Sequence, residues 1–167
     1  EGGLGKTALL NEWIKSISND RFSKIFAWSF YTQGTTERIV SGDLFIEKAM
    51  LFFNIKINSK LSPWEKGVKL AEFFIQNKFL VILDGLEPLQ HPPFSPNEGM
   101  LKDIGIKGFI WKLINEKDGE SFCIVTSRIS LKDFQNNQEI EELRLKGLNP
   151  KSGIRLLKYL GVNDDRK

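Results

Sequence analysis

The first residues of the chain, EGGLGKTA, follow a phosphate-binding pattern in which a glycine and any four residues precede Gly-Lys-Ser/Thr. Gly5, Lys6 and Thr7 supply the end of this pattern, and residues 1–4 supply its middle. The leading glycine would stand one position before Glu1, and a β-strand should precede it. We therefore expect the natural polypeptide to continue upstream of this sequence. The alternative interpretation is a glycine-rich turn that caps an ordinary helix.

The chemistry of such a loop requires residues with little or no side chain. Its backbone N–H groups must turn inward around phosphate oxygens, and the helix that follows adds its positive end. Lys6 would reach the β- and γ-phosphates, and the hydroxyl of Thr7 would ligate Mg²⁺, a cation that prefers oxygen ligands. The expected nucleotide-binding residues are Gly2, Gly3, Leu4, Gly5, Lys6, Thr7 and Ala8.

A second segment, FLVILDGLEPL (residues 79–89), carries two acidic residues at the end of an apolar run. The run does not alternate, which predicts a strand that is buried on both faces and breaks at Gly85. Asp84 would then hold the Mg²⁺ shell, and Glu87 would orient or deprotonate an attacking water. The alternative is that Asp84 only caps a turn with Gly85 and that Glu87 is solvated.

A third segment, IVTSR (residues 124–128), also ends an apolar strand with polar groups. Ligands of open parallel sheets bind beyond the carboxyl ends of the strands, and this position would allow Arg128 to sense a γ-phosphate. The alternative is an ordinary salt bridge of Arg128 on the surface.

The apolar patterns predict alternating strands and helices, and therefore a mainly parallel sheet with helices on both faces. The expected strands cover residues 24–30, a run beginning at Phe79, residues 121–128 and residues 139–148. The expected helices cover residues 6–17, 44–53 with Asp43 as cap, 62–77, 106–116, and a last helix started by Asn149 and Pro150. The best-marked helix start combines Ser62 as N-cap with Pro63 and Glu65, which together form a capping box.

The composition is that of an ordinary α/β domain, with 167 residues, 41% hydrophobic and 27% charged. The net charge of +3 comes from scattered Lys and Arg residues without a run of like charges, so a nucleic-acid partner is not indicated. One cysteine, Cys123, excludes an internal disulfide and fits a reducing compartment, so we expect a cytoplasmic protein. No apolar stretch approaches the length of a membrane span, so no membrane partner is expected.

Together the three segments resemble the nucleotide-binding domain of STAND NTPases, the signal-transduction ATPases that include NACHT and NB-ARC proteins. The similar segments are EGGLGKT as Walker A, FLVILDGLEPL as Walker B, IVTSR as sensor 1, and LKGLNPKSGIRLLKYLGV where the helical domain begins. The segment DGLE is closer to the NACHT pattern than to the paired Asp of NB-ARC. FAWSFYTQGT, SPWEKG and DGLEPLQHPP resemble bacterial STAND proteins in particular.

The resemblance implies a fold and a division of the chain. Residues 1–148 would form an ASCE-type P-loop NTPase core, an α/β domain whose mainly parallel sheet is flanked by helices and lacks its first strand. Residues 149–167 would begin a helical domain. The family's winged-helix region, with its nucleotide-contacting histidine, has no counterpart in this sequence.

The resemblance also implies an ATP-driven switch. Such a switch has a closed ADP-bound form, exchanges ADP for ATP, and forms homo-oligomers that activate an effector, in several bacterial members for antiviral defence. Effector and sensor domains would lie elsewhere in the full polypeptide. By position, Lys6 is the Walker A lysine, Thr7 and Asp84 hold Mg²⁺, Glu87 is the catalytic acid, and Arg128 is the sensor arginine.

Three functions remain open at this stage. The first is a slow Mg²⁺-dependent ATPase that acts as a signalling switch, and the second is a nucleotide-binding assembly module without significant turnover, in which Glu87 is structural. The third is a small-molecule kinase, which we rank last because no Arg-rich lid lies between Asp84 and Arg128. The guanine signature Asn/Thr-Lys-x-Asp does not occur, which favours ATP over GTP.

Overall fold

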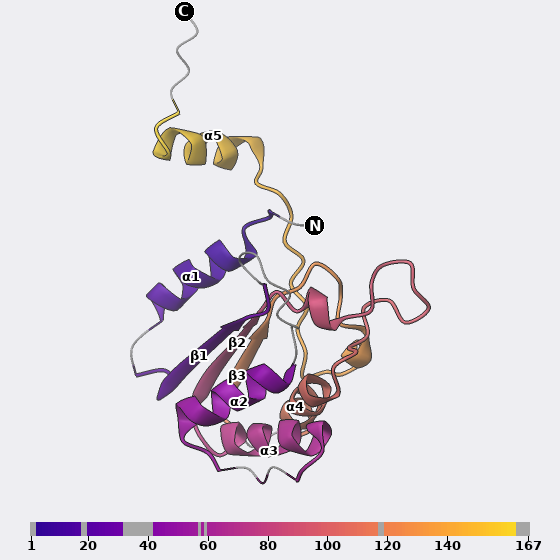
Figure 1. Cartoon of the computed structure of the whole chain (residues 1–167). Helices are drawn as coiled ribbons and strands as arrows, with labels where there is room; N and C mark the ends of the chain where they lie inside the picture. Colours follow the sequence, from indigo (N-terminus) through magenta and orange to yellow (C-terminus); the bar gives the residue numbers. More distant parts are fainter. Residues whose placement is uncertain are drawn as a thin grey trace, which may run out of the picture.

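A computed structural model describes residues 3–17, 20–31, 42–56, 58, 60–116 and 119–162. This part of the chain is an α/β structure in which a three-stranded parallel sheet is flanked by helices (Figure 1). The strands are β1 (Lys24–Ser29), β2 (Phe79–Asp84) and β3 (Phe122–Val125). The α-helices are α1 (Lys6–Ser16), α2 (Gly42–Phe53), α3 (Pro63–Ile75), α4 (Ile104–Asn115) and α5 (Pro150–Tyr159). Two short 3-10 helices are η1 (Glu87–Leu89) and η2 (Lys132–Phe134).

The sheet has the order β1-β2-β3, and both strand pairs are parallel. Ser29, the last residue of β1, pairs with Asp84, the last residue of β2, and Val125 at the end of β3 pairs with Leu83. All three strands therefore end at one edge of the sheet. Polar residues that follow the strands are brought together there, although long stretches of sequence separate them.

One face of the sheet packs against α2, α3 and α4, and this is the main hydrophobic core. Phe45 of α2 and Phe74 of α3 both meet the ring of Phe109 on α4, at centroid distances of 5.5 and 5.6 Å with nearly perpendicular planes. Phe26 of β1 meets Phe45 at 6.0 Å. The core therefore joins the sheet to three helices through aromatic contacts, which favour such tilted and edge-on geometries.

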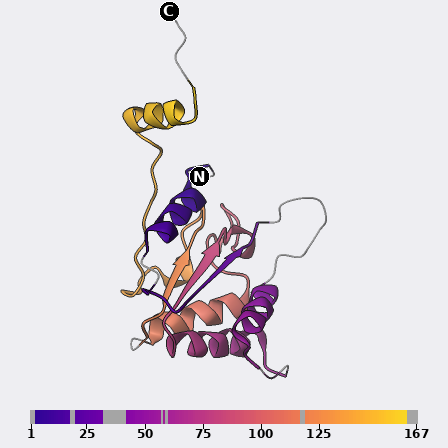
Figure 2. The same cartoon turned by 90° about the vertical axis from the view of Figure 1, so that its left-hand side faces the viewer.

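The other face of the sheet is covered by α1 (Figures 1 and 2). This cover is lighter, because α1 has no buried residue. Ile25 of β1 and Phe122 of β3, which share this face with Leu80 through the strand register, are 39% and 54% exposed. Helix α1, which begins after the glycine-rich loop, thus contributes little to the core. Its main structural effect is to place the residues at its N-terminus near the strand ends.

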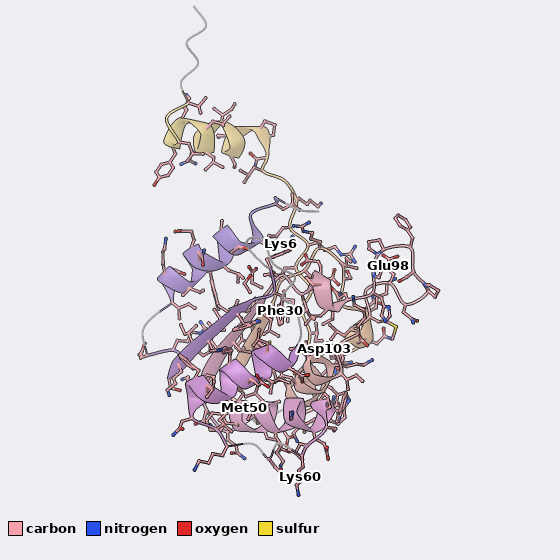
Figure 3. The ribbon with its side chains drawn as sticks, viewed as in Figure 1. Lys6, Phe30, Met50, Lys60, Glu98 and Asp103 are labelled. Carbon is pink, nitrogen blue, oxygen red and sulfur yellow. The ribbon has the colours of Figure 1, made fainter. Side chains whose placement is uncertain are left out.

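Helix caps confirm part of the sequence analysis. The capping box predicted at Ser62 and Glu65 is present, and Asn149 caps α5 as expected. The prediction of Asp43 as a cap was wrong, because α2 begins at Gly42, two residues before the predicted start, and Asp43 lies in its first turn. The sequence analysis also missed Asp103, whose carboxylate accepts hydrogen bonds from the backbone N–H of Ile106 in α4 and of Gly42 in α2, at 2.9 and 2.7 Å (Figure 3).

The close approach of α3 and α4 depends on a glycine. A Cβ atom at Gly67 would lie 2.0 Å from the carbonyl oxygen of Gly105 and 2.9 Å from the backbone nitrogen of Phe109. These are backbone atoms, which cannot rotate away as a side chain can. Only glycine at position 67 therefore allows the two helices to pack at this distance.

The strand predicted over residues 139–148 is wrong. Residues 141–149 lie outside any helix or strand. In the described part of the chain, β3 has one strand partner, which is β2. A strand needs a partner for its backbone N–H and C=O groups, and the described structure offers none beside this segment. Figure 1 shows the segment leading away from the sheet to α5, which has no buried residue. In the residues described here, no helix is long and apolar enough to cross a membrane.

Candidate functional site

The loop before α1 has the backbone conformation that its glycines suggested. Gly3 and Gly5 have φ values of 75° and 82°, in the left-handed region that favours glycine. A Cβ at either position would meet no atom within 4 Å, so conformation and not crowding selects glycine here. The carbonyl oxygen of Gly5, the N-cap, accepts a hydrogen bond from the N–H of Leu9 at 2.8 Å and so begins α1.

The start of α1 points at the edge where the strands end. The first N–H groups of a helix have no acceptor within the helix, and they favour an anion together with the helix dipole. Figure 3 labels Lys6 at this end of α1, whereas Lys60 lies beyond α2 and α3, on the far side of the molecule. Gly2, which we also expected to bind phosphate, lies outside the described residues.

A hydrogen-bonded group joins α1 to two strand ends. The hydroxyl of Thr7 lies 3.1 Å from both carboxylate oxygens of Asp84. The hydroxyl of Thr126 donates to the same carboxylate at 2.6 Å and accepts from the N–H of Gly85 at 2.9 Å. The carboxylate of Asp84 is therefore held between two threonine hydroxyls. One of them belongs to Thr7, which the sequence predicts to hold Mg²⁺ together with Asp84.

These residues surround a hollow of about 280 Å³. The residues that line it are Gly3, Leu4, Gly5, Lys6, Thr7, Ala8, Tyr31, Asp84, Thr126 and Arg128. Sites that enclose drug-sized ligands usually measure ~300–1,000 Å³, and this hollow lies just below that range. We call it the phosphate pocket below, after the ligand that the sequence leads us to expect there. Apart from Gly2 and Glu87, every residue predicted for the site lines this pocket.

Glu87 lies beside the pocket and does not line it. Its Oε2 atom accepts a hydrogen bond from the hydroxyl of Tyr31 at 2.7 Å. Its Oε1 atom lies 3.7 Å from Nε of Arg128 and has no hydrogen-bond partner among the described residues. Burial, together with the hydrogen bond and negative charge of Glu87, raises the pKa of Tyr31, although Arg128 opposes the rise. Tyr31 therefore keeps its proton at neutral pH and remains a hydrogen-bond donor.

The oxygen atoms in the pocket can bind Mg²⁺ if a phosphate ligand supplies further oxygen atoms. Across the described ranges, no group of three or more His, Cys, Asp or Glu side chains could hold a metal ion alone. Mg²⁺ commonly takes only one or two protein oxygens and completes its shell with phosphate oxygens and waters. Thr7 and Asp84 supply that limited set. The site therefore fits Mg²⁺ that is also coordinated by a phosphate ligand. Its side chains are too few to coordinate a free ion by themselves.

Two residues of the site were missed by sequence reasoning. They are Thr126, in the segment IVTSR (residues 124–128), and Tyr31, directly after the strand predicted over residues 24–30. A signal for both existed, because each follows a parallel strand next to the one that ends in Asp84. Neighbouring parallel strands place such residues at the same edge.

No protein-family model, curated protein or solved structure matches the chain.

Proposed function

We propose that the chain is the nucleotide-binding domain of a STAND-type switch that binds ATP and ADP with Mg²⁺ and hydrolyses ATP slowly. The observation that carries this proposal is the contact between Thr7, at the start of α1, and Asp84, at the end of β2. A glycine-rich loop, a helix N-terminus, a lysine and an acidic strand end converge on one pocket. This is the combination that phosphoryl transfer requires. We also propose that the fold is that of a P-loop NTPase of the ASCE type.

Each residue then has a role that follows from its chemistry. The loop amides and Lys6 bind the phosphate oxygens, Thr7 and Asp84 hold Mg²⁺, and Arg128 contacts the γ-phosphate. Mg²⁺, when bound, would neutralise charge on the phosphates. Glu87 would accept the proton of the attacking water. Homo-oligomerisation in the ATP-bound form, with effector and sensor domains elsewhere in the polypeptide, completes the proposed switch.

A second candidate function is a nucleotide-binding assembly module without significant turnover. The position of Glu87 favours it, because this carboxylate is bound by Tyr31 and Arg128 and does not line the pocket. The two functions share the binding step and differ only in hydrolysis.

Binding is tested by titrating Mg²⁺-ATP and Mg²⁺-ADP into the full-length polypeptide and into two lysine variants, with calorimetric detection. Lys6→Ala removes the positive charge of the lysine from the pocket and should weaken binding by roughly tenfold or more. Lys60→Ala removes an exposed charge on the far side of the molecule and should leave binding unchanged. If Lys6→Ala binds as tightly as the wild type, the proposed phosphate site is wrong.

Turnover is tested with Glu87→Gln. If this variant binds ATP but no longer releases phosphate, the chain is a hydrolytic switch. If the wild type binds ATP and shows a negligible rate that Glu87→Gln does not change, the chain is an assembly module.

A further inference from the structure

Three side chains from three separate segments of the chain meet at the border of the phosphate pocket. Tyr31 follows β1, Glu87 begins η1, and Arg128 follows β3. The hydroxyl of Tyr31 donates to Glu87 at 2.7 Å, and the guanidinium carbon of Arg128 lies 5.5 Å from the centroid of the Tyr31 ring. Arg128 also forms the 3.7 Å ion pair with Glu87. Each of the three therefore contacts both of the others.

The strand ends fix the position of Tyr31. The backbone N–H of Phe30, the preceding residue, donates to the carbonyl oxygen of Asp84 at 2.9 Å. The ring of Tyr31 then lies over Gly85, where a Cβ atom would come within 2.1 Å of ring carbon Cε2. Gly85 has a φ of 76°, so it both makes the turn after β2 and leaves room for the ring.

The arrangement separates Glu87 from the pocket. Tyr31 and Arg128 line the pocket, whereas Glu87 lies behind them with 14% of its side chain exposed. A water molecule in the pocket can contact Tyr31 or Arg128, whereas Glu87 is not part of the pocket wall. One carboxylate oxygen is already occupied by Tyr31, and the other is buried. A general base needs a free oxygen within hydrogen-bond reach of the water, and Glu87 does not offer one in this conformation.

We propose that Tyr31 is a positioning residue that, together with Arg128, latches Glu87 outside the phosphate pocket, so that turnover requires this latch to open. The inference deepens the proposed function and rests on it. A triphosphate in the pocket competes with Glu87 for the guanidinium of Arg128, because phosphate oxygens are strong acceptors for arginine. With Arg128 drawn to the phosphates, only the hydroxyl of Tyr31 still holds Glu87. The latch thereby makes hydrolysis slow and dependent on the γ-phosphate.

The test is Tyr31→Phe, which removes the hydroxyl but keeps the ring over Gly85. We expect kcat for Mg²⁺-ATP hydrolysis to rise roughly threefold to tenfold, the effect of losing one hydrogen bond that holds the resting state. KM and the dissociation constant of ATP should stay close to their wild-type values. The matched control is Tyr159→Phe, since Tyr159 is the other tyrosine of the chain and is exposed on α5. This control should leave kcat unchanged.

The double variant Tyr31→Phe/Glu87→Gln separates positioning from a general structural effect. If Tyr31 acts through Glu87, the added Tyr31→Phe substitution gives no gain in the Glu87→Gln background. An unchanged or lower kcat in Tyr31→Phe alone, or an equal gain in both backgrounds, overturns the latch. If the wild type binds no Mg²⁺-ATP, the proposed function fails and the latch with it. If the wild type binds and Tyr31→Phe has no effect, only the latch fails.

A second measurement keeps Tyr31 in place and does not depend on the folding of Tyr31→Phe. The pKa of Tyr31 can be read from the ¹³C chemical shift of its labelled ring in a nuclear magnetic resonance titration. The charged groups around it are Glu87 on η1, Arg128 after β3, and the pocket residues Asp84 and Lys6. The pKa of Tyr31 should be raised in the wild type and should fall when Glu87→Gln removes the charge, because Arg128 then lowers it without opposition from Glu87. An ordinary pKa that Glu87→Gln does not change contradicts the contact.

Discussion

The hydroxyl oxygen of Thr7 lies 3.1 Å from both carboxylate oxygens of Asp84, although 77 positions separate the two residues in the sequence. If the two share Mg²⁺ with a nucleotide, Thr7→Val keeps the shape of the side chain and removes the ligand. We expect the affinity for ATP to fall roughly tenfold in the presence of Mg²⁺ and to change little with a chelator present. Calorimetric titration with and without Mg²⁺ measures both values.

Thr126→Val is the comparison for this prediction. Thr126 donates to the same carboxylate at 2.6 Å but comes from the end of β3 and is not expected to ligate the metal ion. Its loss should lower the free energy of unfolding more than Thr7→Val does, because its hydroxyl is buried and bonded to both Asp84 and Gly85. If Thr7→Val lowers affinity equally with and without Mg²⁺, Thr7 binds no metal ion.

The crossing of α3 and α4 gives a stability prediction. Gly67→Ala would place a methyl group 2.0 Å from the carbonyl oxygen of Gly105, so the two helices must separate. We expect the free energy of unfolding in urea to fall by about 2 kcal/mol or more, the usual cost of overpacking. The matched control is Gly153→Ala in α5, where the new Cβ meets nothing within 4 Å. It should be neutral or slightly stabilising, because alanine is the better helix former. Equal effects of the two substitutions would contradict the close crossing.

The capping box of α3 gives a second stability prediction. Ser62 accepts a hydrogen bond from the N–H of Glu65, and the Glu65 side chain accepts from the N–H of Ser62. Ser62→Ala should lower the free energy of unfolding by about 1 kcal/mol, since α3 is part of the core. Asn149→Ala removes a similar cap from α5, which has no buried residue, and should leave the main unfolding transition unchanged. Chemical denaturation of both variants decides the point, and a shift for Asn149→Ala would show that α5 unfolds together with the sheet.

The single cysteine gives a prediction about pH. Part of Cys123 is accessible, but its side chain packs against the core, and burial raises the pKa of the thiol from 9.0 to about 12. Alkylation by iodoacetamide at pH 8 should therefore be about a thousandfold slower in the folded than in the unfolded protein, because only the thiolate reacts. Between pH 9 and 12 the unfolded state has lost the proton that the folded state keeps. The contribution of this group to stability is thus present below pH 9 and is lost as the pH rises to 12. Rapid alkylation under native conditions would contradict the burial.

The sequence predicted the parts of the site that depend on strand ends. Asp84 and Arg128 each follow an apolar run, and parallel strands must bring such residues to one edge. The same reasoning brings Tyr31 to this edge, because it follows β1, but it does not predict the contact of its hydroxyl with Glu87. Its contact with Glu87 requires β1 to lie next to β2, and it also requires Gly85 to leave space for the ring. Neither condition can be read from the residues near Tyr31.

The incorrect strand over residues 139–148 has a similar explanation. Its residues suit an extended backbone, and the structure has no helix there. Whether an extended segment becomes a strand depends on a neighbour that accepts its hydrogen bonds, and local composition does not contain that information. The double cap at Asp103 was missed for the same reason, because one of its two donors, Gly42, lies 61 positions away.

The order in which the pocket can form follows from the parallel sheet. The hydroxyl of Ser23, just before β1, donates to the carbonyl of Lys78, 55 positions later, and Thr126 reaches Asp84 across 42 positions. Both strand pairs therefore close long loops, which costs chain entropy before any contact is gained and places such domains among slower folders. The pocket draws on residues from Gly3 to Arg128, so it is complete only after both strand pairs have formed. If a phosphate ligand binds there as proposed, it stabilises only the fully assembled sheet, and its binding reports completed folding.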